Sequence, residues 1–146
     1  MIKTNHNRLY YAGVSFRLPN NMYIDTNTEI VHENGLCFEA ENGEFNISIV
    51  FNYCDDTSEN ILKTIFEDYS AIIYKPISNI EWNGLNGSCA VYALARAEYY
   101  EIQFNPVDGY DENCSIVVRA ETSKAKIGEI MVREEVTEFL KDIRKE

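Results

Sequence analysis

The chain has 146 residues and carries 13 Lys and Arg against 24 Asp and Glu, which gives a formal net charge of −11. This length suits one domain with its own hydrophobic core. The acidic balance repels nucleic-acid phosphates and anionic membranes, so it excludes both as expected partners. Basic proteins, cationic peptides and divalent cations are favoured, although the charge can also serve only to keep the protein soluble.

Neither a signal peptide nor a membrane span is indicated. Residues 1–8 are polar, and no apolar segment of a signal peptide follows them. No run approaches the ~20 apolar residues that cross a bilayer. We therefore expect a cytoplasmic protein, or an exported one if a signal sequence has been removed.

The four cysteines are widely and irregularly spaced, at Cys37, Cys54, Cys89 and Cys114. Structural zinc sites usually contain close pairs of ligands, so no metal is expected here. Three of the four lie in or beside predicted strands, where buried thiols behave as small apolar side chains. Disulfides are the alternative if the protein is exported.

The sequence predicts a flexible lead-in over residues 1–11, and one α/β domain over residues 12–146. Apolar and polar residues alternate over 45–53, which predicts a strand with one buried face. The apolar face of that strand comprises Phe45, Ile47, Ile49, Phe51 and Tyr53. Shorter strands are predicted at Val14–Leu18 and Leu36–Ala40, the second joined to 45–53 by an Asn-Gly turn.

A helix is predicted to begin near Asp56, whose spacing to Glu59 fits a capping box. Apolar residues then recur at helical spacing from Ile61 to Ile73. Pro76 limits how far this helix extends, because the proline ring clashes with the preceding turn.

The second half is predicted to form an antiparallel meander and a terminal helix. Period-two alternation returns at 77–82 and again at 100–105 and 116–120. Between the first two, residues 88–95 are small and have little polarity on either face, which predicts a central strand covered on both faces or one on which a helix rests closely. The period then changes to 3.6, with Gly128 as a weak point of the helix. The predicted strands are 77–82, 88–95, 100–105 and 116–120, and the predicted helix is 125–144.

Three short segments resemble the PsbP/Mog1-like superfamily: Gly13–Pro19, Asn83–Gly87 and Tyr99–Ile102. The resemblance covers about residues 12–144. It implies an α+β fold, an αβα sandwich around a mainly antiparallel sheet. Members of that superfamily are mostly non-enzymatic; PsbP assists the photosynthetic oxygen-evolving complex, and Mog1 binds a small GTPase. No motif in this chain carries over a particular partner or binding residue.

No catalytic constellation, phosphate-binding loop or cofactor motif is recognisable. His32 stands beside Glu33 and five residues before Cys37, a conceivable Cys–His pair that no oxyanion loop accompanies. The loop at 108–112 clusters three carboxylates without the ligand spacing of an EF-hand. We therefore expect a protein that is not an enzyme and has no metal and no cofactor.

Ten tyrosines are the unusual feature of the composition. Tyrosine is enriched at protein interfaces, and it also packs well in sheets. The sequence predicts a binding or accessory domain, monomeric or dimeric, that acts through protein–protein contacts. Two alternatives remain: an acidic dimer resembling secretion chaperones, and a small-ligand-binding or hydrolytic domain. The predicted contact residues are Tyr99, Asp108, Tyr110, Asp111 and Glu112.

Overall fold

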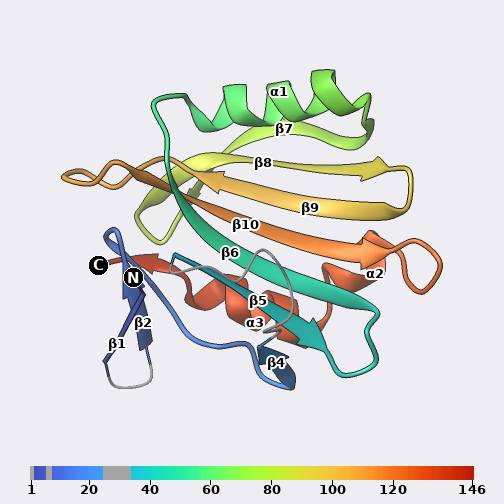
Figure 1. Cartoon of the computed structure of the whole chain (residues 1–146), viewed down its shortest axis with the longest axis horizontal. Helices are drawn as coiled ribbons and strands as arrows, with labels where there is room; N and C mark the ends of the chain where they lie inside the picture. The colour runs from blue at the N-terminus through green and yellow to red at the C-terminus, as the bar shows by residue number, and fades with distance from the viewer. Residues whose placement is uncertain (1, 6–7, 25–33) are drawn as a thin grey trace.

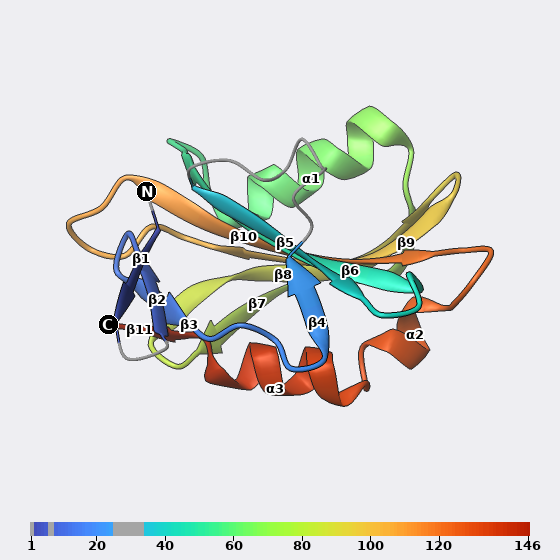
Figure 2. The same cartoon turned by 60° about the horizontal axis from the view of Figure 1, so that its bottom comes forward.

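In the computed structural model, which describes residues 2–5, 8–24 and 34–146, a seven-stranded antiparallel sheet forms the centre. Helix α1 covers one face of it, and helices α2 and α3 lie on the other (Figure 1, Figure 2). A four-stranded sheet adjoins one end. The elements are β1 (Lys3–Asn5), β2 (Arg8–Tyr11), β3 (Val14–Phe16), β4 (Met22–Ile24), β5 (Gly35–Ala40), β6 (Phe45–Tyr53), α1 (Ser58–Tyr69), β7 (Ile72–Trp82), β8 (Leu85–Leu94), β9 (Ala97–Phe104), β10 (Glu112–Glu121), α2 (Ile127–Ile130), α3 (Glu134–Asp142) and β11 (Arg144–Lys145).

The large sheet has the strand order β4-β5-β6-β10-β9-β8-β7, so β4 and β7 form its edges. The prediction of a strand at 45–53 is confirmed by β6, and four of its five predicted inward residues are buried. Tyr53, the fifth, is 73% exposed at the last position of the strand. The chain is thus a mixed α/β protein built on antiparallel pairing.

The two faces of this sheet differ in chemistry. Ile102 and Phe104 of β9 join the hydrophobic core on the face that carries α2 and α3. Glu101 and Gln103 alternate with them and lie on the α1 face, where Gln103 stands opposite Ser88. Ser88 in turn hydrogen-bonds Ser58 of α1 at 3.1 Å. The principal core therefore lies on one side of the sheet, and the α1 side is largely polar.

Helix α1 is shorter than predicted. Its N-cap is Thr57, whose Oγ1 accepts a hydrogen bond from the Asn60 N–H, so the predicted pairing of Asp56 with Glu59 is wrong. The helix ends at Tyr69 because Ser70 adopts a left-handed conformation with φ of 50°. Ile72 and Ile73, predicted to continue the helix, begin strand β7 instead. β-Branched side chains favour strands, which agrees with this outcome.

The predicted terminal helix over 125–144 is also wrong, because it is divided into α2 and α3. The break falls after Ile130 and not at Gly128. Arg133 is the extended N-cap residue of α3, with ψ of 143°. Strand β11 then replaces the last residues of the predicted helix.

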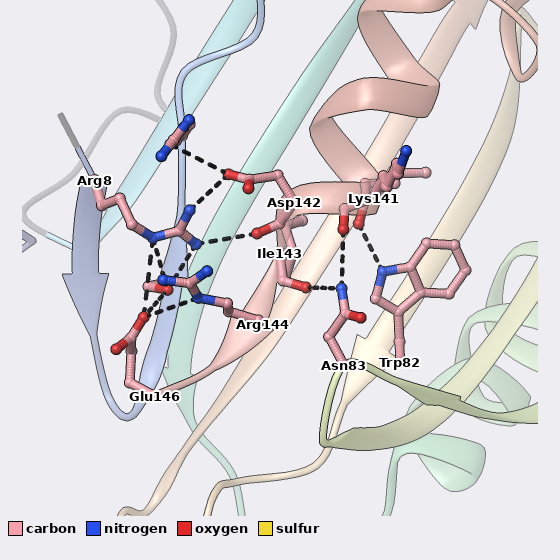
Figure 3. Close-up of polar contacts among 11 residues, drawn as sticks. Arg8, Trp82, Asn83, Lys141, Asp142, Ile143, Arg144 and Glu146 are labelled. Atoms are coloured by element: carbon pink, nitrogen blue, oxygen red, sulfur yellow. Dashed lines mark hydrogen bonds and ion pairs between the residues drawn. The ribbon is translucent and has the colours of Figure 1, made fainter.

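The segment predicted as a loose lead-in contains strands β1 and β2, which join β3 and β11 in the small sheet. Arg8, only 4% exposed, ties this sheet to the end of α3. Its Nη1 donates to the Asp142 carboxylate at 2.9 Å, and its Nη2 donates to the Asp142 carbonyl at 3.0 Å (Figure 3). A second acceptor is Ser15 Oγ, 2.8 Å from Nη2. The buried guanidinium is thus both paired and hydrogen-bonded.

The turn between β7 and β8 caps the other side of α3 (Figure 3). Trp82 Nε1 donates to the Leu140 carbonyl at 2.6 Å. The Asn83 amide donates to the carbonyls of Lys141 at 2.9 Å and Ile143 at 2.7 Å. These carbonyls lie at the end of α3, where a helix supplies few donors of its own.

We predict that Asn83→Gly lowers the free energy of unfolding by about 1–3 kcal/mol, because carbonyls at the α3 terminus lose their donor. Glycine tolerates the left-handed backbone at this position, where φ is 48°. Asn21→Gly is the matched control, since Asn21 is exposed and has φ of 59°. Urea unfolding measures both; equal losses in the two variants would contradict the capping role.

Candidate functional site

The start of strand β7 exposes large apolar side chains at an edge of the main sheet. Ile72 is 66% exposed, and Ile73 and Tyr74 are about half exposed. Val132, which follows α2, is 75% exposed and lines the same groove as Tyr74. Contiguous exposed apolar side chains of this size mark interaction surfaces more often than singly scattered ones do. We call residues 72–75 the open edge.

The remainder of β7 is less available to an incoming strand. Its pairing with β8 shifts register between Ile73 and Lys75 and again between Lys75 and Ser78. Pro76 lies in the second irregularity and has no N–H to donate. Beyond it, Trp82 is bonded to α3 and packs against the core. Bulges and proline are devices that limit strand addition at sheet edges, so the open edge is short.

A groove of about 630 Å³ runs beside the open edge, between β7 and α2. Volumes of this order hold small ligands or the side chains of a partner. Its charged residues balance in sign, with two lysines and two glutamates, in a chain whose net charge is −11. The lining residues are Tyr74, Lys75, Val91, Glu98, Lys126, Ile127, Gly128, Glu129, Met131 and Val132.

Glu98 of β9 fixes both walls of this groove. One carboxylate oxygen accepts the Tyr74 hydroxyl hydrogen at 2.6 Å, and the other accepts the Ile127 N–H at 2.9 Å. The hydrogen bond from Tyr74, followed by that from Ile127, lowers the pKa of Glu98. The carboxylate is therefore ionised at neutral pH and engaged on both oxygens. It links β7 to α2 and so fixes the geometry of the groove. Being ionised, it carries no proton that it could donate to a substrate.

A second carboxylate, Glu101, lies under α1 in a row of hydrogen-bonded side chains across three strands. Tyr92 donates to it at 2.7 Å from β8, and the Gln103 amide donates at 2.7 Å. Gln103 Oε1 accepts in turn from Asn113 at 2.8 Å and from Ser115 at 2.6 Å, both on β10. Burial raises the pKa of Glu101, although both of its donors oppose that effect.

Perturbed carboxylates of this kind are often catalytic. Glu101, however, is only 4% exposed, and Tyr92 and Gln103 are buried with it. Both of its oxygens accept hydrogen bonds from protein donors, Tyr92 and Gln103. The row satisfies the polar groups of a buried sheet face, as buried polar networks generally must.

Four of the five predicted contact residues lie together. Asp108, Tyr110 and Asp111 belong to the loop between β9 and β10, and Glu112 is the first residue of β10. Tyr99 lies near the opposite end of β9, where its ring stacks on Tyr92 with centroids 5.1 Å apart. The structure therefore separates Tyr99 from the other four. Their role in protein binding remains a prediction.

Sequence reasoning missed the open edge, because Ile72 and Ile73 also fit the period of the preceding helix. The adjacent β-branched and aromatic residues, Ile-Ile-Tyr, were the available signal for a strand. It also missed Tyr10 and Tyr11 as neighbours of Tyr110, with which they line a second cavity.

Several other predictions concern thiols, metals and membranes. His32 of the considered Cys–His pair lies outside the described residues, and its partner Cys37 is buried. Cys54, Cys89 and Cys114 are free thiols. Across 2–5, 8–24 and 34–146, no three His, Cys, Asp or Glu side chains gather as metal ligands. Nor is any helix in those ranges both long and apolar enough to span a bilayer.

No family model and no curated protein matches the chain. Among solved structures, a crystal structure from Bacteroides thetaiotaomicron VPI-5482 is similar, with a TM-score of 0.53 and 12% sequence identity. The match covers 92% of this chain and 45% of the other, so this chain spans less than half of that structure. At such low identity the likeness shows the fold alone.

We predict that Glu101→Gln changes the pH dependence of stability. Because burial raises the folded-state pKa of Glu101, the folded protein binds this proton more tightly than the unfolded chain does. Its contribution to stability is therefore present in acid and lost as the pH rises through the folded pKa. Relative to the variant, the wild-type free energy of unfolding should fall as the pH rises above the ordinary glutamate pKa of about 4.3. Urea titrations that run parallel for both proteins would contradict this.

Proposed function

We propose that the chain is a non-catalytic protein-binding domain of Mog1/PsbP-like architecture. Two features support the architecture: helices on both faces of a mainly antiparallel sheet, and the three short segments that resemble that superfamily. The observation that carries the function is the open edge at Ile72–Lys75, whose exposed apolar side chains border a preformed groove.

The occupant we propose is an extended segment of another protein. An edge strand offers unpaired backbone groups with which such a segment pairs, while pockets beside the strand select its side chains. Here the pairing covers only the residues before Pro76, and one apolar side chain of the segment enters the groove between Val91 and Met131. The register shifts and Pro76 limit strand addition along the rest of β7.

A second copy of the chain is the alternative occupant, as in the chaperone-like dimer. Each copy carries a net charge of −11, so long-range repulsion opposes self-association. A neutral or basic partner meets no such barrier. The charge-balanced groove is compatible with either occupant, and the oligomeric state separates them.

We predict that Gly128→Phe and Ile72→Lys each reduce partner capture by about tenfold, the loss of roughly 1.4 kcal/mol of binding free energy. Gly128 lines the groove and a Cβ there meets no atom within 4 Å, so we expect a larger side chain at this position to begin without a clash and to obstruct the groove. Lysine at 72 places a charge among the apolar contacts. The measurement is affinity capture from native lysate, quantified by mass spectrometry, with unfolding midpoints recorded for each variant.

Gly128→Ala and Tyr53→Lys are the controls. The first adds one methyl group and leaves the groove open; the second alters an equally exposed apolar residue, 73% exposed, on β6. Both should capture the partner as the wild type does. Equal capture by all four variants would refute the site. A wild-type dimer in sedimentation equilibrium that Ile72→Lys converts to a monomer would instead identify a second copy as the occupant.

A further inference from the structure

A second cavity, of about 450 Å³, lies at the opposite end of β9 from the groove. Three tyrosines from two distant segments surround it: Tyr10 and Tyr11 of β2, and Tyr110 of the β9–β10 loop. Its volume is within the range of small-ligand sites. The complete lining is Tyr10, Tyr11, Ala12, Gly13, Val14, Tyr110 and Glu146.

Close contacts hold these rings in place. Gly13, in the β2–β3 turn with φ of 79°, has no side chain where a Cβ would lie 2.9 Å from Val107 and 3.0 Å from the Tyr110 ring. The Tyr110 N–H donates to the Val107 carbonyl at 2.9 Å within the same loop, so both residues that approach Gly13 belong to one hydrogen-bonded turn. Tyr11 packs edge-on against Phe51, with ring centroids 5.0 Å apart. Although Tyr110 is half exposed, its ring is therefore positioned before any ligand arrives.

The charges around this cavity are of both signs. Glu146 is the charged residue among those lining it, and the hydrogen bond from Ser15 chiefly lowers its pKa, so it is ionised at neutral pH. Arg144 Nε lies 3.3 Å from the Glu146 carboxylate and Arg8 Nε lies 3.9 Å from it, so these two guanidinium groups offset the Glu146 charge. The neighbouring loop adds Asp108, Asp111 and Glu112, and none of the three forms an ion pair within the described part of the chain.

We propose that this tyrosine-lined cavity binds an alkylammonium group. The faces of tyrosine rings attract cations, and aromatic cages recognise quaternary ammonium and methylated lysine in this way. The acidic residues of the neighbouring loop favour a cation over an anion, and the rings of Tyr11 and Tyr110, already held by packing contacts, reduce the ordering cost of binding. The site is separate from the open edge and does not depend on the function proposed for it.

The test is a titration of the ¹⁵N-labelled protein, followed by NMR, with choline and with 3,3-dimethyl-1-butanol, its uncharged isostere. Choline should shift the amide signals of residues 10–14, 107–112 and 144–146. The isostere should bind at least about tenfold more weakly, because it lacks the charge that the rings and carboxylates attract. A parallel titration with lysine amide shows which kind of molecule supplies the alkylammonium group. Tighter binding than choline indicates a basic side chain of a protein, and weaker binding indicates a small molecule.

Variants of Tyr110 separate the ring from mere apolar volume. Tyr110→Leu should weaken choline binding about tenfold, whereas Tyr110→Phe keeps the aromatic face and should stay within about twofold of the wild type. Tyr53→Leu, at an exposed tyrosine outside the cavity, is the control and should bind normally. Equal affinity for choline and its isostere, no shifts with either cation, or shifts confined to other surfaces would each overturn the proposal.

Discussion

The whole arrangement depends on covering one apolar face of the large sheet. Strands β6, β9 and β10 present their buried aromatic and branched side chains to the same side, and α3 and the small sheet are the layers that close it. The end of α3 is anchored from two directions, by Arg8 and by the Trp82–Asn83 turn. A buried guanidinium is costly unless it is fully paired, so this anchoring requires the positions of Asp142 and Ser15 to be well defined.

The two candidate surfaces follow from that closure. Helix α3 is joined to the second half of β7 through Trp82, whereas the apolar side chains of the first half are exposed. The same anchoring brings β11 beside β3, which places Glu146 next to the tyrosine-lined cavity. Structural contacts at one end of α3 therefore lie close to both candidate surfaces.

The sequence was informative where one periodicity dominated. The alternation in β6 and β10 predicted both strands and their buried faces, since a half-buried strand leaves a period of two. The prediction failed at Ile72 and Ile73, because their spacing fits a helix and a strand equally well. The left-handed conformation of Ser70 ends the helix before them, and the sequence did not indicate that conformation. Arg8 was also unpredictable, because burial of a charge depends on partners such as Asp142 that lie 134 positions away. The groove shares this difficulty, since its walls come from four separate elements.

The most direct test of the binding account is site-specific photo-crosslinking inside cells. A photoreactive phenylalanine analogue is introduced at Ile72 of the open edge and, separately, at the equally exposed Tyr53. The account predicts a discrete covalent adduct with another protein from position 72 and none from position 53. Absence of any adduct at 72, or the same adducts from both positions, would contradict it.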